Sequence, residues 1–134
     1  MIHYLDNAER TRLTAALTAL ETGPTEADLA SAPVLDGWNA AVMGKEAILV
    51  GQVHGHPVAE GEVYTSPVLM LDVERGIART ISRWYRIGYP LDEAATDLVE
   101  KLMRPRSHLR LVQMPEFERT VSTRLTAYRK AIAA

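Results

Sequence analysis

The sequence predicts an α+β fold in which a four-stranded, mainly antiparallel meander sheet is flanked by N-terminal and C-terminal helices. Apolar residues recur at helical spacing before residue 36 and after residue 90, but at every second position in between. The connections between successive candidate strands are short, which favours antiparallel neighbours. The 134 residues suit a single domain. We expect residues 1–36 to form N-terminal helices, 37–90 the sheet and 91–134 a C-terminal helical extension.

Two helices are predicted in the N-terminal part. The first is expected over residues 6–21, where leucines recur at helical spacing and Asp6 is available as a cap. Gly23-Pro24 ends this helix. Thr25 is expected to cap a short second helix, and Pro33 to close it.

Four strands are predicted next, separated by glycine-containing turns. Their expected ranges are 38–42, 47–53, 62–71 and 77–87. Pro67 cannot donate a backbone hydrogen bond, so the third strand should lie at an edge or carry a bulge there. Trp38, Trp84 and Tyr85 are expected to be at least partly buried.

The C-terminal part returns to helical spacing. A third helix is expected from Leu91 to about residue 104, and Pro115 is expected to open a last helix. The last helix carries a continuous apolar stripe, made of Phe117, Val121, Leu125, Tyr128 and Ile132. Such a stripe packs either against the sheet or against a second copy of the chain, which would form a homodimer.

Composition restricts the chemistry and the location. The absence of cysteine excludes disulfides, thiolate catalysis and Cys-ligated metals. No apolar run approaches the roughly 20 residues that span a bilayer, so we expect a cytoplasmic protein that does not enter a membrane. Residues 1–74 carry three Lys or Arg against eleven Asp or Glu, whereas residues 75–134 carry twelve against six. This split predicts internal pairing, with a basic face for nucleic acid as the alternative.

Two histidines, His54 and His56, are separated by one residue, so an extended strand would project both imidazoles from one face and allow them to chelate a metal ion. Candidate third ligands are Glu62, Asp72 and His108, and the spacing selects none of them. The alternative is a rigid corner, in which Gly55 takes an unusual backbone conformation and Pro57 keeps His56 extended. We favour the corner, and we predict no metal and no other cofactor.

Cations form two clusters that could bind an anionic partner. On a regular strand 77–87, Arg79, Arg83 and Tyr85 share one face and Arg86 lies on the other. The interpretation that we favour is pairing of Arg79 and Arg83 within the sheet, to carboxylates such as Asp72 or Glu62. The second cluster has no acid between residues 101 and 115, and is either a nucleic-acid contact or a solvated linker. The candidate binding residues are Arg79, Arg83, Tyr85, Arg86, Arg104, Arg106 and Arg110.

An enzyme is the competing interpretation of the central segment. Its site would use His54, His56, Thr65, Ser66 and Arg79. No glycine-flanked nucleophile is present, and no Asp is positioned by sequence to orient a histidine. Hydrogen bonds from Thr65 or Ser66 to Thr80 or Ser82 on a neighbouring strand account for the hydroxyls more simply.

Three motifs carry a family resemblance: Gly55-His56-Pro57, Thr65-Ser66 and Ala78-Arg79-Thr80-x-Ser82-Arg83-x-Tyr85. Their order resembles a family of short uncharacterised proteins, found mainly in alphaproteobacteria and described as a domain of unknown function. The resemblance covers about residues 13–90, and the part from Leu91 onward looks like an addition. The resemblance implies no activity, but short proteins of this kind occur as accessory genes on mobile elements.

We therefore expect a small, non-enzymatic accessory protein that acts by protein–protein contact. An inhibitor or regulator of a larger nucleoprotein complex is one version of this function. The alternatives are a small enzyme or metal-binding protein with a site around His54 and His56, and a non-specific nucleic-acid-binding protein that uses the basic C-terminal half.

Overall fold

The N-terminal helices begin where the sequence predicts. The computed structural model describes residues 5–92, 96–97 and 108–133. Helix α1 (Asn7–Thr22) is capped by Asp6, and helix α2 (Glu26–Ser31) by Thr25. In both helices the cap side chain accepts the third N–H, and the acid at that third position accepts the N–H of the cap. These reciprocal bonds fix both helix starts.

One mixed sheet follows, and it corrects the predicted four-stranded meander. In the described part of the chain seven strands are present: β1 (Val34–Met43), β2 (Glu46–His54), β3 (Gly61–Tyr64), β4 (Val68–Asp72), β5 (Ile77–Thr80), β6 (Trp84–Ile87) and β7 (Leu109–Leu111). The order is β3-β2-β1-β6-β5-β4, and β7 also pairs with β1. Strands β1 and β6 are parallel, whereas the other named pairs are antiparallel. The first two residues of β1 pair with β6, and its end pairs with β7.

Two predicted strands are each broken into two. The predicted strand 62–71 divides at Ser66-Pro67, so that β3 pairs with β2 while β4 pairs with β5 at the other end of the sheet. Proline lacks the N–H that a continuous ladder needs, which explains the break. The predicted strand 77–87 divides at a turn in which the Thr80 hydroxyl accepts the N–H groups of Ser82 and Arg83 at 3.1 and 3.2 Å. This turn makes β5 and β6 a hairpin.

A bulge in β1 depends on a glycine in the neighbouring strand β2. The β1–β2 register shifts between Asp36 and Asn39. A Cβ on Gly51 of β2 would lie 2.8 Å from the Asp36 carbonyl oxygen, so the two backbones can approach only without a side chain there. Within the bulge, Trp38 is buried and its indole donates to the Gly88 carbonyl at 2.9 Å. This arrangement joins β1 to the end of β6.

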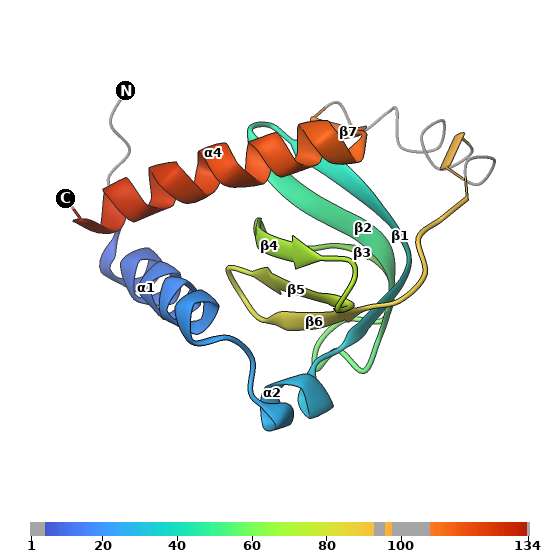
Figure 1. Ribbon diagram of the computed structural model, residues 1–134, viewed down its shortest axis with the longest axis horizontal. Helices are drawn as coiled ribbons and strands as arrows, with labels where there is room; N and C mark the ends of the chain where they lie inside the picture. The colour runs from blue at the N-terminus through green and yellow to red at the C-terminus, as the bar shows by residue number, and fades with distance from the viewer. Residues whose placement is uncertain (1–4, 93–95, 98–107, 134) are drawn as a thin grey trace.

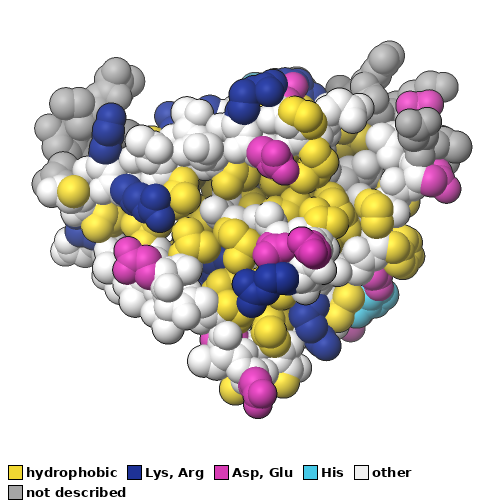
Figure 2. Space-filling view, in the orientation of Figure 1, with side chains coloured by type: hydrophobic (Ala, Val, Ile, Leu, Met, Phe, Trp, Pro, Cys, Tyr) yellow, Lys and Arg dark blue, Asp and Glu magenta, His cyan; other side chains and the backbone are white. Residues whose placement is uncertain are grey.

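Helix α4 (Met114–Ala133) crosses the open side of the strongly curved sheet (Figure 1). Its Phe117 is fully buried in the main core, together with Leu35, Leu49 and Tyr85, and Val121 packs against the same cluster. Apolar side chains remain visible in the middle of this face, with charged ones around them (Figure 2). The first half of the predicted stripe therefore packs against the chain's own sheet, and a homodimer through this helix stays a prediction.

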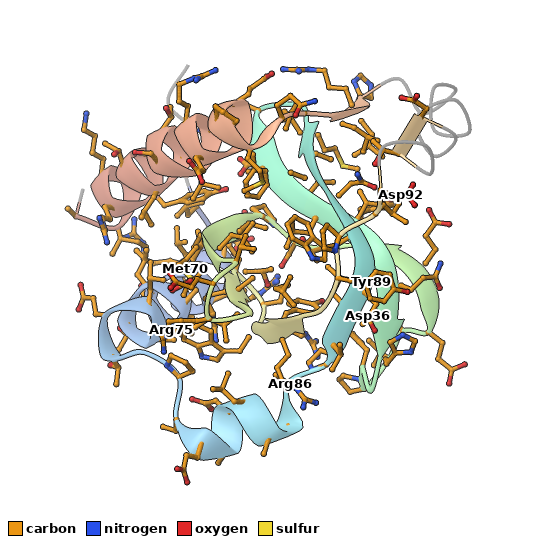
Figure 3. The ribbon with its side chains drawn as sticks, turned by 45° about the vertical axis from the view of Figure 1, so that its right-hand side comes forward. Asp36, Met70, Arg75, Arg86, Tyr89 and Asp92 are labelled. Carbon is orange, nitrogen blue, oxygen red and sulfur yellow. The ribbon has the colours of Figure 1, made fainter. Side chains whose placement is uncertain are left out.

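Helix α1 is attached to the sheet by a second apolar cluster and to α4 by hydrogen bonds at one end. On the other side of the β5–β6 hairpin, Trp84 and Ile77 pack with Ala19 of α1 and with Met70, which lies beside α1 (Figure 3). The Arg10 guanidinium donates to the carbonyls of Ile132 and Ala131 at 3.1 and 3.3 Å, at the C-terminal end of α4. The two long helices are thus joined at one end.

The predicted third helix, from Leu91 to about residue 104, lies largely outside the described residues. Arg104 and Arg106 lie outside them as well.

Candidate functional site: a cleft between the two long helices

The two histidines of the central segment have separate partners. His54 Nε2 lies 3.5 Å from Asp36 Oδ2, and the His54 side chain is 64% exposed. His56 Nδ1 accepts the N–H groups of Val58 and Ala59, both at 3.1 Å, and its ring tilts against the Tyr85 ring with centroids 6.4 Å apart. Within the described residues, no three His, Asp or Glu side chains are placed to hold a metal ion. The arrangement is that of a rigid corner.

The hydroxyls of the proposed enzyme site are also occupied by backbone bonds. Thr65 is buried, and its Oγ1 accepts the N–H of Leu49 at 3.1 Å. Ser66 Oγ accepts the N–H of Ser82 at 3.3 Å, which is one of the contacts expected between these segments. Neither hydroxyl is hydrogen-bonded to a histidine in the described part of the chain, so the geometry lacks the nucleophile–base pair that activation of a hydroxyl requires.

The arginines of the predicted strand 77–87 are separated by the turn at Thr80. Arg79 is the cross-strand partner of Trp84, and its guanidinium carbon lies 5.5 Å from the centre of the indole. Burial lowers the pKa of Arg79, and the nearby charge of Asp28 opposes this shift. Arg86 donates twice to the Ala32 carbonyl at the end of α2 (Figure 3). Among the described residues no ion pair joins Arg79 to Asp72 or Glu62, so the expected pairing of Arg79 with them is wrong.

Arg83 and Tyr85 form the remaining part of that cluster. Tyr85 is 4% exposed and belongs to the main core, so its ring is unavailable for stacking on a ligand. Burial raises the pKa of Tyr85, and the charge of Arg83 opposes that rise. Burial, and then the charge of Arg83, lower the pKa of His56. The Arg83 guanidinium has no ion pair within the described ranges, and its charge acts on His56 and Tyr85.

Arg110 is a further correction. The sequence places it in a basic loop, but the structure places it in β7, opposite Val42. Its guanidinium pairs with Glu116 at 2.5 Å on an exposed surface. Arg110 therefore already has a partner within the chain.

A cleft lies between α1, α4 and the turn that joins β1 to β2, near the end where Arg10 joins the two helices. Its volume is about 600 Å³, within the range of ligand-binding pockets. Most of its wall is apolar and comes from Leu5, Leu13, Pro67, Ile81, Ala127 and Ala131. Five charged side chains also line it: Glu9, Arg12, Lys45, Glu46 and Arg124.

A polar cluster joins α4 to the β1–β2 turn in the wall of this cleft. Arg124 Nη2 lies 2.8 Å from Glu46 Oε1, and the two side chains are 18% and 24% exposed. The Tyr128 hydroxyl donates to Glu46 Oε2, and the Arg124 guanidinium carbon lies 4.9 Å from the centre of the Tyr128 ring. Glu46 thus receives one cation and one hydroxyl, which holds α4 at a fixed distance from the sheet.

The electrostatics of the cluster follow from burial and from Glu46. Burial raises the pKa of Tyr128, and the hydrogen bond to Glu46 and its charge raise it further. Burial acts to lower the pKa of Arg124, but the hydrogen bond and charge of Glu46 outweigh burial, and the net change is upward. At neutral pH the cluster therefore holds a neutral tyrosine and a charged arginine. Arg124 Nε is buried and has no hydrogen-bond partner among the described residues, so the guanidinium has unused donor capacity.

None of the charged cleft residues was among the candidate binding residues. Tyr128 was expected only as part of an apolar stripe, although a half-buried tyrosine needs a partner for its hydroxyl. Arg124 precedes it by four residues and therefore lies on the same face of α4. Glu46 belongs to the acidic half and Arg124 to the basic half, so this pair joins the two halves, whereas the Arg110–Glu116 pair lies within the basic half. The charge split was the available signal, but it names no residue.

Residues 2–117 match the model of a protein family described as a family of unknown function, DUF6634. The chain belongs to this family. The match extends past Pro90 and ends at Phe117 within α4, so the expectation that residues 91–117 are an addition is wrong. In this DUF6634 member, Arg124 and Tyr128 lie beyond the matched residues. Searches of curated proteins and of solved structures found no match. Among the described helices, none is long and apolar enough to cross a membrane.

Proposed function

We propose that this protein is a small accessory protein that binds a segment of a protein partner in the cleft between α1 and α4. The observation that carries the proposal is the cleft itself, which combines an apolar wall with charged groups at its margin. Binding sites of this kind use apolar area for affinity and a few polar groups for orientation.

The alternative of a small enzyme receives less support from the geometry. The Thr65 and Ser66 hydroxyls and His56 Nδ1 accept backbone N–H groups, and Arg79 stacks on Trp84. These groups do not converge on the cleft, which of this set includes only Ser66 in its lining. A binding function needs no such convergence, because a rigid wall of the right shape and charge is sufficient.

Regulation of a larger nucleoprotein complex is one version of this function. It rests on the occurrence of short proteins of this kind as accessory genes on mobile elements. The nucleic-acid alternative has weaker support among the described residues, because Arg110 and Arg124 pair with carboxylates, and Arg79 and Arg86 contact neighbouring groups of the fold. We therefore place the partner contact on protein.

Site-specific photo-crosslinking tests the location of the partner. A photoreactive side chain at Ala127 in the cleft should crosslink a partner in cells, whereas the same side chain at Thr123, on the exposed face of α4, should not. The captured partner is then purified, and its affinity is measured for the wild type, Ala127→Trp and Thr123→Trp. We expect Ala127→Trp to weaken binding at least about tenfold, since it fills the cleft, and Thr123→Trp to bind normally. Equal crosslinking from both positions, or equal affinities, would refute the proposal.

A further inference from the structure

We propose that the cleft recognises the C-terminal end of its partner: a free carboxylate together with an apolar last side chain. This inference rests on the proposed function, because it names the part of the partner that enters the cleft. The evidence for it is the set of charged side chains in the cleft lining and the mixture of apolar and polar groups around them.

The cleft has cations without counter-charges. Glu46 is already occupied by Arg124 and Tyr128, and Glu9 accepts the N–H of Asp6 in the α1 capping box. By contrast, the only hydrogen bond from the Arg12 guanidinium within the described residues is to the neutral hydroxyl of Ser82, at 3.2 Å.

Lys45, in the β1–β2 turn, has no hydrogen bond or ion pair to a described side chain. Arg12 and Lys45 therefore give the cleft lining two positive charges that have no carboxylate partner among the described residues.

The size of this charge favours a carboxylate over a phosphate. Three cations and two carboxylates line the cleft, which leaves a net charge of +1. A carboxylate carries one negative charge and neutralises this excess, whereas a phosphate monoester carries close to two and would lie near Glu9. An arginine and a lysine also supply enough N–H donors for both carboxylate oxygens.

The rest of the lining favours a peptide over a simple fatty acid. The apolar wall can cover a leucine-sized side chain, but the lining also contains polar groups besides the cations. Ser66 has a hydroxyl that can donate, and Glu9 has carboxylate oxygens that can accept. A peptide backbone offers N–H and C=O groups to both, whereas a hydrocarbon tail would leave these groups desolvated and unpaired.

Peptide binding measured by NMR tests this inference directly. The probe is a pool of acetylated tetrapeptides with three randomised positions and a C-terminal leucine, prepared once with a free carboxylate and once as the amide. The free-acid pool should shift the amide signals of Lys45, Glu46, Ala127 and Tyr128 in a saturable way. Amidation removes the charge, so it should weaken binding at least about tenfold.

A matched pair of double variants separates the cleft cations from total charge. Arg12→Gln with Lys45→Gln should bring the affinity for the free-acid pool down to that for the amide pool. Arg119→Gln with Lys130→Gln removes the same charge from exposed positions of α4 that do not line the cleft, and it should leave the affinity unchanged. Both pairs change exposed residues, so folding should be retained.

Three results would overturn the inference: equal binding of the acid and the amide pools, no saturable shifts with either pool, or octanoate binding as tightly as the peptide. Tight binding of octanoate would show that the cleft is a site for free amphipathic carboxylates. If a crosslinked partner enters the cleft but amidation has no effect, the proposed function stands and only the recognition of the chain end fails.

Discussion

The segment from Gly51 to Gly88 and the cleft between α1 and α4 use their polar residues in opposite ways. In the first, hydroxyls, an imidazole nitrogen and two arginines contact neighbouring groups of the fold. In the second, one ion pair holds the walls together, while Arg12 and Lys45 at the margin have no carboxylate partner in the described chain. A high density of chemically capable residues therefore marks a structural corner here, and a sparser set marks the candidate site.

The difference has a physical origin in the geometry of the sheet. Strand β1 bulges, and β5 and β6 turn sharply, so backbone groups near these points need side-chain partners. Threonine, serine and histidine provide such partners over two or three residues. The cleft lies where two helices meet a turn, and helical backbone groups already bond to one another. Its side chains are therefore free to face solvent or a ligand.

Truncation of Trp84 should show the structural role of the central segment most strongly. The ring is 6% exposed and covers Arg79, so Trp84→Ala should lower the free energy of unfolding by about 3–5 kcal/mol. Denaturation by urea, followed by circular dichroism, measures the change. At low denaturant, the folded fraction should still bind a cleft ligand with wild-type affinity. An unfolding midpoint equal to that of the wild type would contradict the assignment.

Two glutamates allow the role of the cleft ion pair to be tested against an exposed pair. Glu46→Gln removes the countercharge from the largely buried Arg124 but keeps an acceptor for the Tyr128 hydroxyl, and should cost about 1–3 kcal/mol. Glu116→Gln breaks the Arg110 pair, where the arginine side chain is 62% exposed, and we expect no measurable change in the urea midpoint. If both variants lose the same stability, the cleft pair has no special role.

The sequence predicts the elements whose signals are local. The starts of α1 and α2 follow from Asp6 and Thr25, because a cap acts over only three residues. The stripe that begins at Phe117 marks the face of α4 that packs on the sheet. The turn residues also place β1 and β2 as antiparallel neighbours, since Gly44-Lys45 leaves no room for a crossover.

The sequence does not predict which distant segments lie next to one another in the fold. The parallel pairing of Val34 with Arg86 joins segments about fifty residues apart, and no local pattern distinguishes a parallel from an antiparallel neighbour. The turn at Thr80 looks like a continuing strand, because isoleucine, serine and arginine all fit the alternation. The cleft combines Arg12, Glu46 and Arg124 from three distant segments, so no local pattern in the sequence indicates it.

The smallest expected effect is a pH dependence that arises at His56 and sharpens the structural reading of this segment. Its pKa in the folded chain is lowered by burial and by Arg83, and Nδ1 must stay unprotonated to accept the N–H groups of Val58 and Ala59. As the pH falls below about 6.5, the unfolded chain binds a proton at this residue that the folded chain does not, so stability should decrease. Asparagine can accept the same N–H groups without titrating.

His56→Asn should therefore match the wild type near pH 7.5 and lose less stability on acidification to about pH 5.5. His56→Ala should be less stable at both pH values, because the two N–H groups lose their acceptor. Urea midpoints at the two pH values measure the difference between the three proteins. If acidification lowers the stability of His56→Asn and of the wild type by the same amount, the fold does not hold the His56 imidazole in its neutral form. The structural role assigned to His56 would then be wrong.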